Sequence, residues 1–75
     1  MGKKILFFQV RTVDKTAYTR VESPAEYTDV VDGLKAAGCA VNRDEDVPFV
    51  HTVQEPDGIS SLQIALVDEY GRNVR

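Results

Sequence analysis

The chain has 75 residues, of which 43% are hydrophobic and 28% are charged, a composition typical of a folded globular domain and not of a disordered segment. Twelve acidic against nine basic residues give a net charge of -3, which argues against a partner bound mainly by neutralising phosphates. A single cysteine excludes an internal disulfide, so we expect a cytoplasmic protein. The length predicts one small domain over residues 1–75.

The first predicted element is a β-hairpin. Residues 4–13 and 16–22 are rich in β-branched and aromatic residues, and their alternating pattern indicates two strands. Gln9 interrupts the first run too early for a membrane span. Asp14 and Lys15 form a two-residue turn in this interpretation, with a longer loop or a bulge as the alternative. The resulting register pairs Val10 with Thr19, Phe8 with Val21, Arg11 with Tyr18 and Gln9 with Arg20.

Residues 23–38 show the signals of a helix. Ser23 can cap its start, Pro24 fits the first helical position, and Glu26 completes a capping box three residues after Ser23. Gly38 supplies the left-handed residue that commonly ends a helix. An apolar stripe at helical spacing lies between these signals. It consists of Tyr27, Val30, Val31, Leu34 and Ala37.

A second hairpin is predicted after the helix. A short extended piece at 39–41 and a loop over 42–46 lead to strands at 47–54 and 59–67. The turn between these strands is Glu55-Pro56-Asp57-Gly58, with Pro, Asp and Gly where a type I turn favours them. The predicted pairs are Val47 with Leu66, Phe49 with Ile64 and His51 with Leu62.

A last turn near Gly71 returns the chain so that Val74 reaches Leu66. The elements together predict an α+β fold in the order ββαββ(β), with one helix on one face of an antiparallel sheet. The sheet has four strands, or five where the C-terminal return adds a short one. The helix would cover Leu6, Phe8, Val10, Val21, Phe49, Ile64 and Leu66. The open face would contain Phe7, Gln9, Arg11, Tyr18, Arg20, Val50, Thr52, Gln63 and Ala65.

The candidate reactive residues do not form a recognisable catalytic or metal site. Cys39 and His51 are the only residues of their types, and a thiolate–imidazole pair is a known nucleophilic arrangement. His51, however, is in phase with apolar residues, and Cys39 behind the helix is typical of a small apolar filler. The acidic run 44–46 lacks the glycine and the distal glutamate of a calcium loop. We therefore expect no enzyme, no cofactor and no metal.

The predicted open face is the first candidate binding surface. Phe7, Arg11, Tyr18 and Arg20 would place aromatic and guanidinium groups side by side. This mix is enriched in protein–protein hot spots, and it can also stack single-stranded bases. A solvated face with Phe7 half covered by the C-terminal tail explains the same pattern without any partner.

The second candidate is an acidic rim. It consists of Glu22, Glu26, Asp29 and Asp32 on the helix and of Asp44, Glu45 and Asp46 in the following loop. Such a row of carboxylates could occupy a basic groove that normally holds nucleic acid. The helix dipole accounts for the acids near the helix start without a partner.

The leading hypothesis is a small non-catalytic protein-binding module, an adaptor or an inhibitor of the kind encoded by mobile elements. It would bind a protein partner or a second copy of itself. The expected partner-binding residues are Phe7, Arg11, Tyr18, Arg20, Glu26, Asp29, Asp44 and Asp46. The alternative is a single-stranded nucleic-acid-binding domain that uses the same sheet face, with an affinity that falls steeply with salt.

Overall fold

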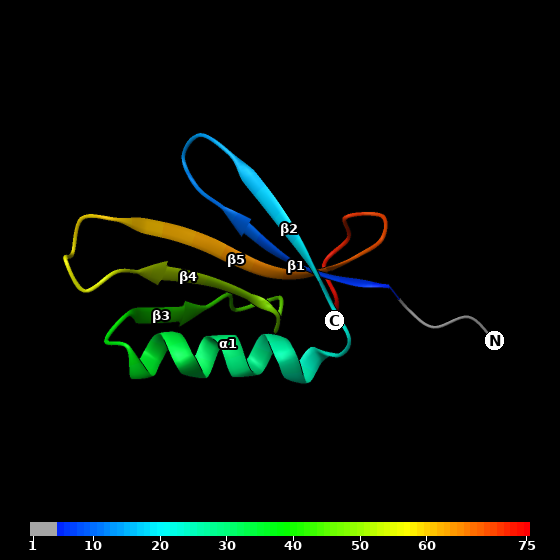
Figure 1. Ribbon diagram of the computed structural model, residues 1–75, viewed down its shortest axis with the longest axis horizontal. Coiled ribbons are helices and arrows are strands. Elements are labelled where there is room, and N and C mark those ends of the chain that lie inside the picture. The colour runs from blue at the N-terminus through cyan, green and yellow to red at the C-terminus, as the bar shows by residue number, and fades with distance from the viewer. Residues whose placement is uncertain (1–4) are drawn as a thin grey trace.

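In a computed structural model that describes residues 5–75, the chain packs one helix against one antiparallel sheet (Figure 1). The elements are β1 (Leu6–Arg11), β2 (Thr16–Val21), α1 (Pro24–Ala36), β3 (Ala40–Arg43), β4 (Val50–Gln54) and β5 (Ser61–Asp68). The strand order is β2-β1-β5-β4-β3, and all neighbours are antiparallel. The predicted α+β class is confirmed. The predicted start of the first strand, Lys4, lies outside the described residues.

The fifth strand lies directly after the helix, where the sequence indicated only a short extended piece. This strand, β3, pairs with β4. The C-terminal return forms a single bridge between Val67 and Asn73. The N–H of Val74 donates to the carbonyl of Leu66 at 3.0 Å, so the predicted approach of these two residues is confirmed. Gly71 adopts a φ of 79° in the turn between them.

The predicted strand pairs are wrong in both hairpins, because each loop is two residues longer than expected. Asp57 explains the second loop: its carboxylate accepts the N–H groups of Ile59 and Ser60 at 2.9 and 3.0 Å. An even shift keeps the side chains of paired strand residues on their side of the sheet, so the predicted faces are right within the strands. Val47 is the exception: the predicted strand began there, but β4 begins at Val50, and Val47 packs on the face opposite Leu66. The observed pairs include Phe8 with Thr19, Gln9 with Tyr18, Phe7 with Arg20, Arg11 with Thr16, His51 with Ile64 and Val53 with Leu62.

Helix α1 starts after Ser23, but the predicted capping box is not formed. The Ser23 side chain makes no capping hydrogen bond, and the carboxylate of Glu26 accepts the N–H of Glu22 instead. The C-terminal end is as predicted: Gly38 has a φ of 95°. The N–H of Cys39 closes this end by donating to the Leu34 carbonyl at 3.1 Å.

The main core lies between α1 and the middle of the sheet. Tyr27 is its central residue, with 1% of its surface exposed. The ring of Tyr27 contacts Phe8 and Phe49 at centroid distances of 5.6 and 5.8 Å. The buried members of this core are Leu6, Tyr27, Val31, Val53, Ile64 and Leu66. The apolar stripe of α1 is narrower than predicted, because Val30 is exposed.

A second, smaller cluster lies on the opposite face of the sheet. Val50, Ala65 and Val67 are buried there, with Phe7 and Val47 packed against them. Val47 comes from the loop between β3 and β4, so this loop covers part of the face that the sequence predicted to be open. That face stays exposed on β2 and at Thr52 and Gln63.

Candidate protein-binding surface

β2 is the least covered strand of the sheet. Within the described part of the chain, β2 pairs with β1 alone, and five of its six residues are exposed. Figure 1 shows α1 on the side of the sheet next to β3 and β4, with β2 on the far side. Among residues 5–75, the outer edge of β2 therefore has no neighbouring strand and no helix lying along it.

The backbone groups on this edge follow from the alternation of hydrogen bonds in antiparallel pairs. The N–H of Thr12 donates to the carbonyl of Lys15 at 2.9 Å and closes the hairpin. Bonded pairs then recur at every second residue of β2. The residues whose backbone groups face β1 are Ala17, Thr19 and Val21. The residues whose N–H and C=O groups face solvent are Thr16, Tyr18 and Arg20.

The four predicted sheet residues lie together on the hairpin. We call Phe7, Arg11, Tyr18 and Arg20 the hairpin face, on the side of the sheet away from α1. Tyr18 is 56% exposed and lies opposite Gln9, while Arg20 lies opposite Phe7. Phe7 is half-buried in the second cluster. The structure thus brings the four residues together, although Arg11 and Tyr18 are diagonal neighbours and not a direct pair.

The hairpin is basic, although the chain is acidic. Arg11, Lys15 and Arg20 lie on it with a single acid, Asp14, whereas eleven of the twelve acidic residues of the chain lie after the hairpin. The hairpin itself therefore has a net positive charge, although Asp68 and Glu69 lie near Phe7 and Tyr18.

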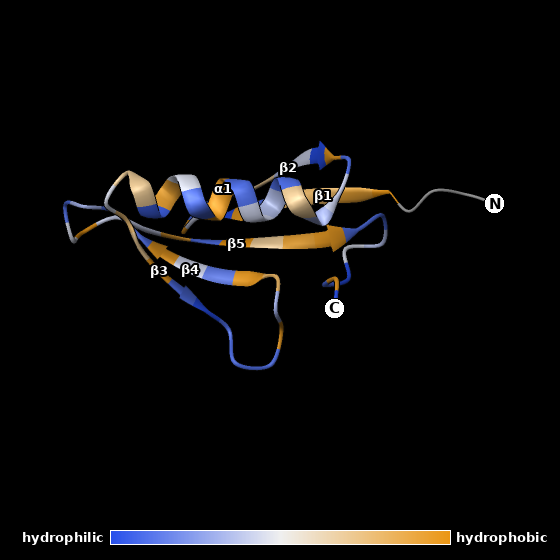
Figure 2. Cartoon of the chain, turned by 90° about the horizontal axis from the view of Figure 1, so that it is seen from below, coloured by the Kyte–Doolittle hydropathy of each residue, from blue (hydrophilic) through white to orange (hydrophobic). Residues whose placement is uncertain are grey.

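The predicted acidic rim is divided into two patches. Glu26 and Asp29 are exposed on α1, whereas Asp44 and Asp46 lie in the loop between β3 and β4. Figure 2 shows α1 and this loop on opposite sides of β5. The Asp44 carboxylate accepts the N–H groups of Asp46 and Val47 at 2.8 and 3.0 Å. These bonds lower the pKa of Asp44 and hold the loop, so this acid has a structural role.

A buried polar pair under α1 is the feature that sequence reasoning missed. The hydroxyl of Tyr27 lies 2.7 Å from Nδ1 of His51 and 3.3 Å from the carbonyl oxygen of Ile64. Burial raises the pKa of Tyr27. Burial also lowers the pKa of His51, and the positive charges of Lys35 and Arg43 lower it further. Tyr27 and His51 both occupy sequence positions at which the pattern predicts a buried apolar side chain. Because a buried polar group needs a hydrogen-bond partner, these two positions were the sequence signal for such a pair.

The structure separates the two candidate reactive residues. His51 lies opposite Arg43 in β3, and Cys39 precedes Arg43 by four residues, about 13 Å along an extended chain. The thiol and the imidazole therefore do not form a catalytic pair. Among residues 5–75, no group of three or more His, Cys, Asp or Glu side chains is placed to hold a metal ion.

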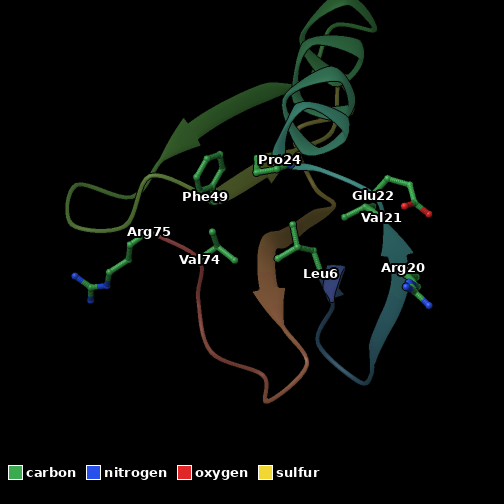
Figure 3. Close-up of a pocket in the computed structure, with 8 residues that line it drawn as sticks. All are labelled: Leu6, Arg20, Val21, Glu22, Pro24, Phe49, Val74 and Arg75. Carbon is green, nitrogen blue, oxygen red and sulfur yellow. The ribbon is translucent and has the colours of Figure 1, made fainter. Parts of the chain in front are cut away.

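A cavity of about 690 Å³ opens where β2 meets the helix start and the C-terminus. Its apolar lining includes Leu6, Val21, Phe49 and Val74. Figure 3 shows the charged ends of Arg20 and Arg75 pointing away from it. Small-molecule sites usually combine such a lining with a few polar groups that orient the ligand, and these arginines do not supply them.

Within the described part of the chain, no helix is both long and apolar enough to cross a membrane. Comparison of the sequence with protein-family models and with curated proteins, and of the structure with solved structures, finds no match.

Proposed function

We propose that this chain is a small non-catalytic protein-binding module, an adaptor or an inhibitor that acts in the cytoplasm and binds through the hairpin. The observation that supports this proposal is the outer edge of β2 beside the hairpin face, which pairs with no strand of residues 5–75. Such an edge gains backbone hydrogen bonds when an extended segment of another polypeptide adds to the sheet. Tyr18 and Arg20 flank the edge, and both residue types are enriched in hot spots.

The sequence of β2 also supports a binding role. Edge strands that avoid pairing usually contain proline, an inward-pointing charge or a bulge. β2 has the sequence TAYTRV, with one charged residue, Arg20, and no proline, and its six pairs with β1 run without a bulge. The edge therefore lacks most of the usual devices that prevent strand addition.

Binding of single-stranded nucleic acid is the second proposal, supported by the basic charge of the hairpin. Sheets that bind RNA commonly stack two or three bases on exposed aromatic rings. The hairpin face offers one exposed ring, Tyr18, because Phe7 is half-buried. A nucleic acid also makes no use of the strand edge, and for this reason we favour a protein partner.

The test compares two double variants in affinity purification from cells that contain the natural partners. The first is Tyr18→Ala with Arg20→Ala. The matched control is Tyr70→Ala with Arg72→Ala, because Tyr70 is exposed and the Arg72 guanidinium carbon lies 5.7 Å from its ring centroid. We expect proteins that are captured by the wild type and the control and lost with the hairpin variant.

Equal capture by both double variants would contradict the proposed surface. Loss of capture confined to variants of Glu26 and Asp29 would move the site to α1. Titration of a fluorescent single-stranded oligonucleotide separates the second proposal: binding that is lost with the hairpin variant and weakens steeply with salt would favour nucleic acid.

A further inference from the structure

We infer that the segment that pairs with the β2 edge is the β2 strand of a second copy of this chain. The two strands would run antiparallel about a two-fold axis, with Thr19 opposite Thr19 of the second copy. The two five-stranded sheets would then form one continuous sheet. This inference rests on the proposed function, because it names the partner of the same edge.

The backbone limits the possible registers. The outward groups belong to Thr16, Tyr18 and Arg20, so two β2 strands pair only where these residues face one another. Two-fold registers centred on Tyr18 or on Thr19 give the longest overlap of the two strands. The choice between them depends on the side chains.

Charge disfavours the register centred on Tyr18. It places Arg20 of the second copy opposite Thr16, which already has Arg11 on its other side in β1. Two guanidinium groups would then flank one small threonine. The two-fold axis produces this contact twice, and like charges are destabilising across strands.

The register centred on Thr19 replaces these repulsions with attractions. Arg20 of the second copy lies opposite Tyr18, where a guanidinium can pack on the ring. Glu22 of the second copy directly follows its β2 strand, and in this register it lies beside Thr16 and faces Arg11 across it. The two backbones are then about 9.5 Å apart, within reach of the two long side chains. The two-fold axis produces each contact twice.

The face on the α1 side of the hairpin is compatible with the same register. Ala17 lies opposite Val21 of the second copy, and Val10 flanks Ala17 in β1. Val10 and Val21 are only half-buried in one copy, so pairing extends a row of apolar side chains across the axis. A 75-residue chain has little core of its own, and such added burial stabilises it.

The contact between Arg11 and Glu22 forms only between copies. Arg11 lies opposite Thr16 at the loop end of the hairpin, and Glu22 is six residues further along the chain, about 20 Å in an extended strand. Any attraction between these two residues therefore reports the second copy and not a contact within one chain.

The test is light scattering coupled to size-exclusion chromatography on the full chain, from about 10 μM to about 1 mM, where a weak association is populated. We expect a dimer whose fraction rises with concentration. Arg11→Glu and Glu22→Arg should each weaken the dimer roughly tenfold, because each puts two like-charged contacts in the interface. An equimolar mixture of the two variants should restore dimerisation, because every contact then joins opposite charges.

Arg72→Glu is the matched control, because it reverses a charge outside the hairpin, and it should leave dimerisation unchanged. A wild type that is monomeric at every concentration overturns the inference, and so does a dimer that the charge reversals do not affect. Either result leaves the proposed function to its own test with other proteins. Amide hydrogen exchange on the wild type gives a second readout. Protection of Tyr18 and Arg20 should rise with concentration, and unchanged exchange at both overturns the pairing.

Discussion

The two edges of the sheet differ in how they are protected. β3 has four residues, and its Val41 packs with the core under α1. β2 has six residues, and only Val21, the last of them, is partly buried. Helix α1 connects these two edges and lies beside β3. One edge is therefore short and supported by the helix, whereas the other is long, regular and free. This asymmetry is the structural basis of the proposed binding role.

The largest expected effect is the difference in stability loss between two tyrosine substitutions, one under α1 and one on β2. Tyr27→Ala removes a completely buried ring and should lower the free energy of unfolding by about 3–5 kcal/mol. Tyr18→Ala removes an exposed ring on the hairpin face and should change it by less than about 0.5 kcal/mol. Urea unfolding followed by circular dichroism measures both values.

Tyr27→Phe is the milder control, because it keeps the ring and removes only the hydroxyl that contacts His51. It should cost about 1–3 kcal/mol through the polar groups left unpaired. Similar losses for Tyr18→Ala and Tyr27→Ala would show that the hairpin is as well packed as the core, and the comparison of the two edges would fail.

The next effect tests which backbone groups of β2 face outward. Thr19→Pro removes an N–H that faces β1 and should destabilise the chain by about 2–3 kcal/mol more than Tyr18→Pro, which removes an outward one. Unfolding measured at low protein concentration excludes any contribution from a dimer. The opposite order would reverse the assignment of the free edge and with it the register of the proposed dimer.

The fold was predictable where a repeating pattern determines it. Alternation in the strands placed residues such as Phe8 and Tyr18 on the correct faces, and it did so despite wrong loop lengths, because both errors were even. The loop lengths depend on a few local hydrogen bonds, such as those of Asp57. β3 was not predicted as a strand of the sheet, because Asn42 and Arg43 resemble a loop and only pairing with β4 makes them extended.

The candidate site was predictable in part for the same reason. The hairpin face comes from two strands joined by a short loop, so local pattern brings Arg11, Tyr18 and Arg20 together. Predicting the acidic rim correctly required the path of the longer loop between β3 and β4. Val47 of this loop packs on the face opposite α1, so the loop acids lie away from those of the helix. Predicting the contact of Tyr27 with His51 required both the position of α1 on the sheet and the strand register, and no local sequence pattern contains either.

The smallest expected effect concerns pH and the helix-covered side. The pKa of His51 lies below its ordinary value of 6.5 because burial and two nearby cations, Lys35 and Arg43, disfavour its charged form. The folded chain therefore takes up this proton less readily than the unfolded chain. Stability should fall as the pH decreases through 6.5 toward the lowered pKa, by no more than about 1.4 kcal/mol per pH unit.

Urea unfolding at several pH values between about 7.5 and 5.5 measures this slope, a window more than about one unit above the ordinary carboxylate pKa values. Asp44 and Asp57 do not contribute there, because backbone hydrogen bonds lower their pKa values further. His51→Asn keeps a polar side chain beside the Tyr27 hydroxyl but has no proton to gain, so its stability should be flat over the same range. An equal slope in this variant would assign the pH dependence to another group. If the stability of the wild type did not change over this pH range, His51 would be as accessible to protons as a residue of the hairpin. The contrast between the covered and uncovered sides of the sheet would then lose its electrostatic support.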